Sequence, residues 1–284
     1  MAEPIGYSKN KASEVLDKHN IDLLIASTPV NVFYTTGLPV LHVAPNPILY
    51  ILSNQYPNLS MVRRDGEESA LIWSLYDSVE EFSWINPKNV YRVGSLKAAI
   101  DILLKKVEEW ELSNKTIGLE SYMPRYQSEA LRNKFPNAKF VEGDKAFIDM
   151  RLIKTEEEVR RIKKSTEVAE KAIQACIDAT EEGILDTELL KIARRTIVDE
   201  GAWGWDHLTM SIGPSDPEAP GLGIPVTRND LVRFDFGAVW EGYISDVSRG
   251  VVIGEMPRKA KEIMEYMIQV QDYCVDNIKP GINT

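Results

Sequence analysis

The sequence predicts an α/β domain over residues 1–149, followed over residues 150–284 by a second domain that combines long helices with strands. Three observations support this class. A length of 284 residues favours two domains rather than one. In the first half, short apolar runs alternate with helical periodicity, which is typical of a mixed or parallel sheet covered by helices. From Met150 onward, this alternation gives way to long amphipathic helices and a pair of strands.

The elements of the first domain follow in chain order. A helix is expected to end near Lys18-His19-Asn20, and the apolar run from Ile21 to Ala26 predicts a buried strand. Four more strands are expected, at residues 48–52, 70–73, 116–119 and 139–141, with helices at residues 96–110 and 127–135. Since no GxGxxG or GxxxxGK[ST] motif follows any of these strands, the sequence gives no support for nucleotide binding.

The second domain opens with a strong helix signal. Thr155 and Glu158 form a capping box at the start of a long helix. Apolar residues recur at three- and four-residue steps from Val159 to Cys176, which predicts one buried face. A further helix, two strands and a last helix are expected at residues 187–200, 231–236, 243–247 and 257–278. The positions of the last helix that we expect to face inward are Ile263, Met267, Val270, Cys274 and Ile278.

Composition excludes several classes of partner. The formal net charge of −10 argues against nucleic acid and anionic membrane surfaces, because both require a basic protein surface. No apolar run reaches membrane-spanning length, and the N-terminus lacks the features of a signal peptide, so a cytoplasmic location is expected. Cys176 and Cys274 lie in helical segments and predict buried thiols rather than a disulfide.

Two aspartates in the predicted strand pair are candidate metal ligands. Asp235 interrupts an apolar strand, where an unpaired carboxylate would be costly to bury. Asp246 follows after Gly237 and Gly242, which we interpret as markers of a turn. If the two strands form a hairpin, both carboxylates reach one point and offer the oxygen ligands that divalent cations take. The alternative is a buried salt bridge from Arg233 or Arg249 to one of the two aspartates.

The same segment resembles a known family. Asp235-Phe-Gly-Ala, Gly242-Tyr243, Ser245-Asp246 and Ser248-Arg249 resemble the signature of the creatinase/prolidase, or pita-bread, metallopeptidases, and most of all that of Xaa-Pro dipeptidase and aminopeptidase P. Residues 21–37 resemble the first strand and turn of the creatinase-type N-terminal domain, and residues 150–158 resemble the junction into the catalytic domain. The resemblance covers nearly the whole chain in the expected order.

The resemblance implies a fold and a metal site. It implies a creatinase-like N-terminal α/β domain over residues 1–149 and the N-terminal portion of a pita-bread metallohydrolase domain over residues 150–284. The family holds two divalent ions (Mn²⁺, Co²⁺ or Zn²⁺) with two aspartates, which match Asp235 and Asp246, and with a histidine and two glutamates further along. Because the sequence stops at Thr284, before that region, we expect weak or absent metal binding and no normal catalysis by this chain.

The histidines depart from the family pattern. Prolidase and aminopeptidase P usually carry a histidine in the loop before the first aspartate, whereas residues 213–223 contain none. The nearest histidine is His207, which is weighed as a pocket residue against a purely structural role beside two tryptophans. His19 and His42 have weaker claims. The missing loop histidine puts Xaa-Pro cleavage in doubt more than it affects the expected fold.

The resemblance implies a hydrolase of short peptides with proline second, in which a metal-activated bridging water attacks the peptide carbonyl. It also implies a homodimer. Two alternatives stay open: a relative that acts on a small non-peptide amide or related metabolite, and a non-catalytic binding module of the same fold. Retention of Asp235 and Asp246 weighs against the binding module, since such a module has no need to bury both carboxylates.

Overall fold

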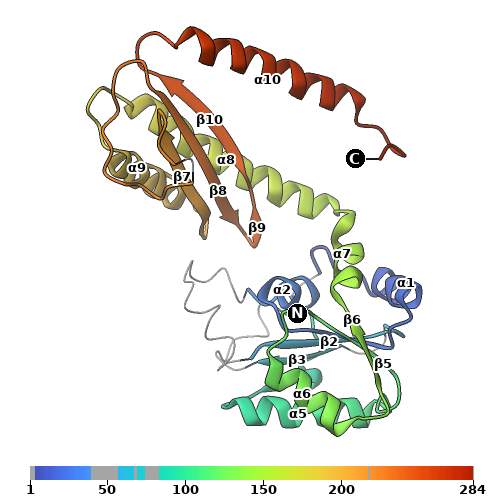
Figure 1. Ribbon diagram of the computed structural model, residues 1–284. Coiled ribbons are helices and arrows are strands. Elements are labelled where there is room, and N and C mark those ends of the chain that lie inside the picture. Colours follow the sequence, from blue (N-terminus) through green and yellow to red (C-terminus); the bar gives the residue numbers. More distant parts are fainter. Residues whose placement is uncertain (1–3, 40–56, 67–68, 74–82, 217, 284) are drawn as a thin grey trace. The chain divides into compact units, whose positions relative to one another are not determined.

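The computed structural model describes residues 4–39, 57–66, 69–73, 83–216 and 218–283 (Figure 1). Backbone contacts divide the chain into two compact units. The first comprises residues 1–164 and 239–243, and the second comprises residues 165–238 and 244–284. The domain boundary expected between residues 149 and 150 stays a prediction.

The first unit is built on a mixed sheet. Its strands are β1 (Leu23–Ala26), β2 (Leu59–Arg63), β3 (Ser69–Trp73), β4 (Val90–Arg92), β5 (Thr116–Leu119) and β6 (Lys139–Glu142). Its helical elements are α1 (Lys9–His19), α2 (Pro29–Thr36), the 3-10 turn η1 (Pro87–Asn89), α5 (Leu96–Glu109), α6 (Arg125–Lys134), α7 (Asp144–Leu152) and the start of α8 (Glu156–Ala179). The sheet order is β4-β3-β2-β1-β5-β6, with β2 antiparallel to both β1 and β3 and the other pairs parallel.

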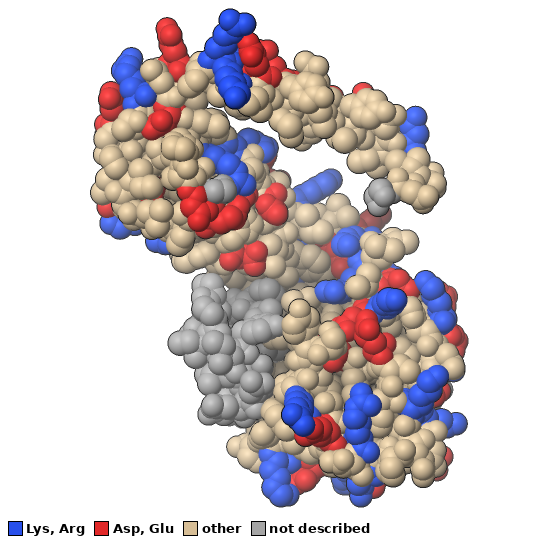
Figure 2. Space-filling view, viewed as in Figure 1, with Lys and Arg blue, Asp and Glu red and all other residues tan. Residues whose placement is uncertain are grey.

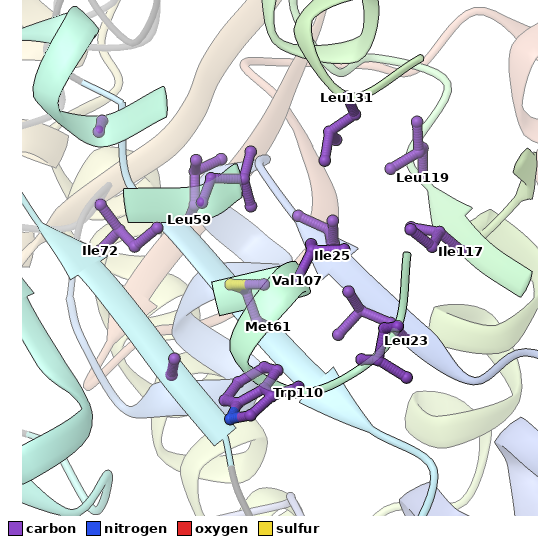
Figure 3. Packing of buried hydrophobic residues seen from close by; sticks show 14 of the residues in the cluster. Leu23, Ile25, Leu59, Met61, Ile72, Val107, Trp110, Ile117, Leu119 and Leu131 are labelled. Carbon is purple, nitrogen blue, oxygen red and sulfur yellow. The ribbon is translucent and has the colours of Figure 1, made fainter. Parts of the chain in front are cut away.

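Neighbouring side chains of β1 serve two separate cores, because successive residues of a strand point to opposite faces. Leu24 and Ala26 pack on the face covered by α1, α2 and α7. Leu23 and Ile25 pack on the other face with α5 and α6, where Figure 3 shows them among the side chains of β2 and β5. The predicted mixed sheet with helices on it is therefore confirmed.

Most of the expected elements of the first unit are present. The strands expected at residues 21–26, 70–73, 116–119 and 139–141 correspond to β1, β3, β5 and β6, and both expected helices correspond to α5 and α6. The strand expected at residues 48–52 lies outside the described residues. The sequence analysis missed α2, β2, β4 and α7.

A buried carboxylate explains why α2 forms. Its sequence is rich in β-branched and aromatic residues, which favour strands. Glu120, only 3% exposed, accepts hydrogen bonds at the helix start from the backbone N–H groups of Ser27 and Thr28, from both their hydroxyls and from the Asn31 side-chain amide. A negative charge at this end stabilises the helix because it faces the positive pole of the helix dipole.

The predicted capping box at the start of α8 is confirmed. The Thr155 backbone N–H donates to Glu158 Oε2 at 2.7 Å, and the Glu158 backbone N–H donates to Thr155 Oγ1 at 3.2 Å. The Tyr243 hydroxyl donates to the other oxygen of Glu158 at 3.0 Å. Burial and the nearby Glu158 charge raise the pKa of Tyr243 above its usual range. Glu158 therefore caps the start of α8 and also binds Tyr243, a residue of the 239–243 segment, through a hydrogen bond.

The second unit contains the rest of α8, then α9 (Asp186–Asp199), β7 (Gly204–Ile212), β8 (Leu231–Trp240), β9 (Tyr243–Ile244), β10 (Val247–Val252) and α10 (Arg258–Asn277). Its sheet has the order β10-β8-β7, with β9 also paired to β8. Strand β7 was not expected, and the strand expected over residues 243–247 is two short strands separated by Ser245 and Asp246. Ala169, Ile173 and Cys176 line the predicted buried face of α8, whereas Val159 is 39% exposed.

The expectation that one face of the last helix is buried is wrong. No residue of α10 is buried, and Ile263, Met267 and Ile278 are 53%, 56% and 71% exposed. Cys274 is likewise an exposed thiol rather than the buried one that we expected. Periodicity identifies the apolar side of a helix but not whether another element covers it. Figure 2 shows α10 as a largely uncharged surface beyond its first turns. None of the described helices has the length and apolar character needed to cross a membrane.

Candidate metal centre

Asp235 lies on the polar face of an otherwise buried strand. Val232, Phe234 and Phe236 of β8 are fully buried, so the alternation of the strand places Arg233 and Asp235 together on the opposite face. The Asp235 side chain is 14% exposed. A carboxylate this poorly hydrated needs a positive partner to offset the cost of its burial.

The predicted hairpin brings Asp246 to the same place. β10 pairs antiparallel with β8 in a register that sets Val247 opposite Phe236 and Ser248 opposite Asp235. Asp246 directly precedes β10, and its side chain is 82% exposed. The hairpin expected from the sequence is confirmed.

The residue before Asp246 fixes the chain at this point. Buried Ser245 exchanges two hydrogen bonds with Ala238: its backbone N–H donates to the Ala238 carbonyl, and its hydroxyl accepts from the Ala238 N–H, both at 3.1 Å. The same hydroxyl donates to the Ser165 carbonyl of α8 at 3.1 Å. These bonds hold the backbone beside Asp246, although its own side chain is exposed.

His207 on β7 completes the group. Its Nε2 atom lies 3.7 Å from Asp235 Oδ1 and 3.6 Å from Asp246 Oδ1. One ligand atom from each of the three residues lies within 4.8 Å of the others. The sequence analysis left open whether His207 is a pocket residue or a purely structural one. In the structure it lies next to both predicted metal ligands.

Arg233 competes for part of this site. Its Nη2 atom lies 2.5 Å from Asp235 Oδ2, so the salt bridge weighed in the sequence analysis is present. Arg249, the other arginine considered there, pairs with Glu170 at 2.9 Å. Arg233 pairs with Oδ2, whereas Oδ1 of Asp235 lies 3.7 Å from His207 Nε2.

Gly237 makes room for the histidine ring. A Cβ atom at this position would lie 2.6 Å from His207 Cε1, 2.7 Å from His207 Nδ1 and 2.5 Å from the Ser245 carbonyl oxygen. The sequence analysis interpreted Gly237 as a turn residue, but it lies inside β8, and the turn is formed by Glu241 and Gly242 with φ of 45° and 87°. A glycine within an apolar strand signals close approach of another group, and this signal was available in the sequence.

These residues fit a divalent cation. Ligands about 2.1 Å from a tetrahedral ion lie about 3.4 Å apart, close to the separations between His207 and the two aspartates. Two carboxylates and an imidazole form a donor set suited to Zn²⁺, Co²⁺ or Mn²⁺. The space that Gly237 leaves for the ring supports the same arrangement.

Comparison with known proteins decides the family. The model of the creatinase/prolidase N-terminal domain matches residues 9–153, and that of metallopeptidase family M24 matches residues 160–284. The chain is 30% identical over 275 residues to a Xaa-Pro dipeptidase of Pyrococcus horikoshii, an alignment that covers 96% of this chain and 71% of that protein. The chain belongs to metallopeptidase family M24.

Solved structures agree with the M24 assignment. The prolidase from Pyrococcus horikoshii superposes with a TM-score of 0.78 at 28% identity, over 96% of this chain and 73% of that chain. The prolidase from Pyrococcus furiosus gives a TM-score of 0.75 at 25% identity, over 95% of this chain and 73% of that chain. The predicted fold class, a creatinase-like N-terminal domain followed by part of a pita-bread domain, is confirmed. M24 membership implies the use of divalent metal.

Proposed function

We propose that this protein is a metal-dependent hydrolase of short peptides that removes proline from Xaa-Pro dipeptides, with Asp235 and Asp246 as metal ligands. One observation carries the proposal. The carboxylates of Asp235 and Asp246 converge on His207 in a chain that resembles a Xaa-Pro dipeptidase over 275 residues. Divalent ions bound there would supply an activated bridging water and stabilise charge that develops on the peptide oxygen.

The residues of this chain have definable tasks in that reaction. Asp235 and Asp246 provide anionic oxygens from two paired strands, and Ser245 holds the backbone beside Asp246. Arg233 neutralises part of the Asp235 charge and fixes the orientation of its carboxylate. A fixed carboxylate binds a metal ion more tightly, because folding has already restricted its side chain and metal binding need not do so.

The test is an assay of the natural gene product with Mn²⁺ or Co²⁺ on Ala-Pro, Met-Pro and a tripeptide panel, with free proline as the measured product. We expect release of proline from the dipeptides and its loss in Asp235→Asn. Asp178→Asn, at an exposed position on α8, is the matched control and should keep the activity. Absence of proline release from every peptide would eliminate the proposed specificity.

A second candidate is hydrolysis of a small non-peptide amide, favoured by the absence of a histidine from residues 213–223. Metal-dependent turnover of small amides without turnover of peptides would support it. Weak metal binding and lack of catalysis by residues 1–284 alone, and a homodimer, stay predictions.

A further inference from the structure

Both ring nitrogens of His207 have acidic neighbours. Nε2 faces Asp235 and Asp246, while Nδ1 lies 3.2 Å from Asp206 Oδ2. Histidine ligands in metal sites commonly donate their second N–H to a carboxylate, which fixes the tautomer and the ring orientation. Asp206 Oδ2 is placed to accept a hydrogen bond from Nδ1–H, and in that tautomer the Nε2 lone pair is directed at the two aspartates.

Two further contacts shape the same site. Gly237 leaves the space in which the His207 ring lies against β8. Arg233 pairs with Asp235 Oδ2 at 2.5 Å, and Oδ1 is the Asp235 oxygen that lies 3.7 Å from His207 Nε2. The three side chains therefore bring one ligand atom each to a common position.

We propose that His207 Nε2 is a third protein ligand of a divalent cation, bound together with Asp235 Oδ1 and Asp246 Oδ1, and that Asp206 orients the imidazole. The inference rests on the proposed function only in taking the aspartate pair as the cation site. Three ligands that include an imidazole favour Co²⁺ or Zn²⁺ over Mg²⁺, which prefers oxygen ligands and retains its waters. This binding would be tighter than a site of two carboxylates provides.

The test uses Co²⁺ alone as the probe, with calorimetric titration for affinity and the visible absorption of Co²⁺ for its coordination. His207→Ala and His207→Gln should each weaken binding about tenfold or more and change the Co²⁺ spectrum, since loss of even an outer-shell partner costs about 10- to 100-fold. Circular dichroism of each variant checks that it folds.

His19→Ala is the matched control, because His19 contacts Asp149 in the other unit and should leave binding unchanged. Unaltered affinity and spectrum in folded His207 variants would overturn the inference. If Asp235→Asn abolishes binding while His207→Ala does not, only the role of His207 fails. If neither substitution affects binding, the aspartate site fails as well.

Discussion

Arg233 and Asp235 lie two residues apart on one face of β8, with Nη2 of the arginine 2.5 Å from Oδ2 of the aspartate. Within the site, a guanidinium and a bound cation would share one carboxylate. Arg233→Met should lower the free energy of unfolding of the metal-free chain by about 2 kcal/mol, because Asp235 loses a charged hydrogen bond. The same substitution should tighten Co²⁺ binding, because it removes a nearby positive charge.

Urea unfolding with and without Co²⁺, together with calorimetric titration, measures both effects. Arg249→Met is the matched control: its partner Glu170 is 49% exposed, and surface pairs contribute only about 0–1 kcal/mol. Co²⁺ binding to Arg233→Met that is no tighter than to the unmodified chain would contradict this account.

The Glu120 carboxylate should be a major contributor to the stability of the first unit. At the start of α2, its two oxygens act as acceptors in all the hydrogen bonds that the structure shows, and every partner is an N–H or O–H donor. In Glu120→Gln a side-chain amide N–H₂ would face donors, so we expect a loss of about 2–3 kcal/mol in chemical denaturation followed by circular dichroism. Glu129→Gln, which alters an exposed pair with Arg125, should change stability far less.

The sequence predicted the sheet of the first unit because its strands are short apolar runs between turn residues. It missed α2 because Val32, Phe33 and Tyr34 favour a strand, and the group that stabilises the helix start, Glu120, is supplied from far along the chain. Local patterns contain no information on such a partner. The exposed face of α10 was missed for the converse reason, since its periodicity implies a covering element that the described residues do not provide.

In the metal centre, the sequence identified Asp235 and Asp246 and the hairpin that joins them. It did not place His207, because β7 is separated from β8 by a long loop and pairing across such a loop is not encoded locally. Gly237 held the missing information: its lack of a side chain marks the position where the ring approaches the strand. The role of these residues in metal binding stays a prediction.

The two cysteines should differ sharply in reactivity. Burial raises the pKa of the Cys176 thiol to about 12, whereas Cys274 is exposed on α10. Since the thiolate is the reactive form, iodoacetamide at pH 8 should modify Cys274 and spare Cys176 in the folded chain. Mass spectrometry should find one adduct in buffer and two in urea. Cys274→Ser should show none in buffer; an adduct there would mean that Cys176 is accessible.

Stability should fall in acid partly through Glu157. Hydrogen bonds from Arg160 and Arg161 lower the pKa of Glu157 from 4.5 to about 2. Because the folded-state pKa is the lower one, the stabilisation is present above pH 4.5 and is lost as the pH falls toward 2. Glu157→Gln should flatten the pH dependence of the urea midpoint in this window. An unchanged pH dependence in Glu157→Gln would assign the effect to other groups.

Residues 239–243 belong to the first unit although the strands on either side belong to the second. The Arg161 guanidinium donates to the Glu241 carbonyl at 2.8 Å, and Gly242 packs so closely on the Phe33 ring that a Cβ there would lie 2.3 Å from it. During translation, at about 5–20 residues per second, the ribosome must therefore add residues 165–238 before this part of the first unit becomes available. For several seconds the nascent chain would present Phe33 and Glu158 without their later partners, an interval in which a chaperone could bind.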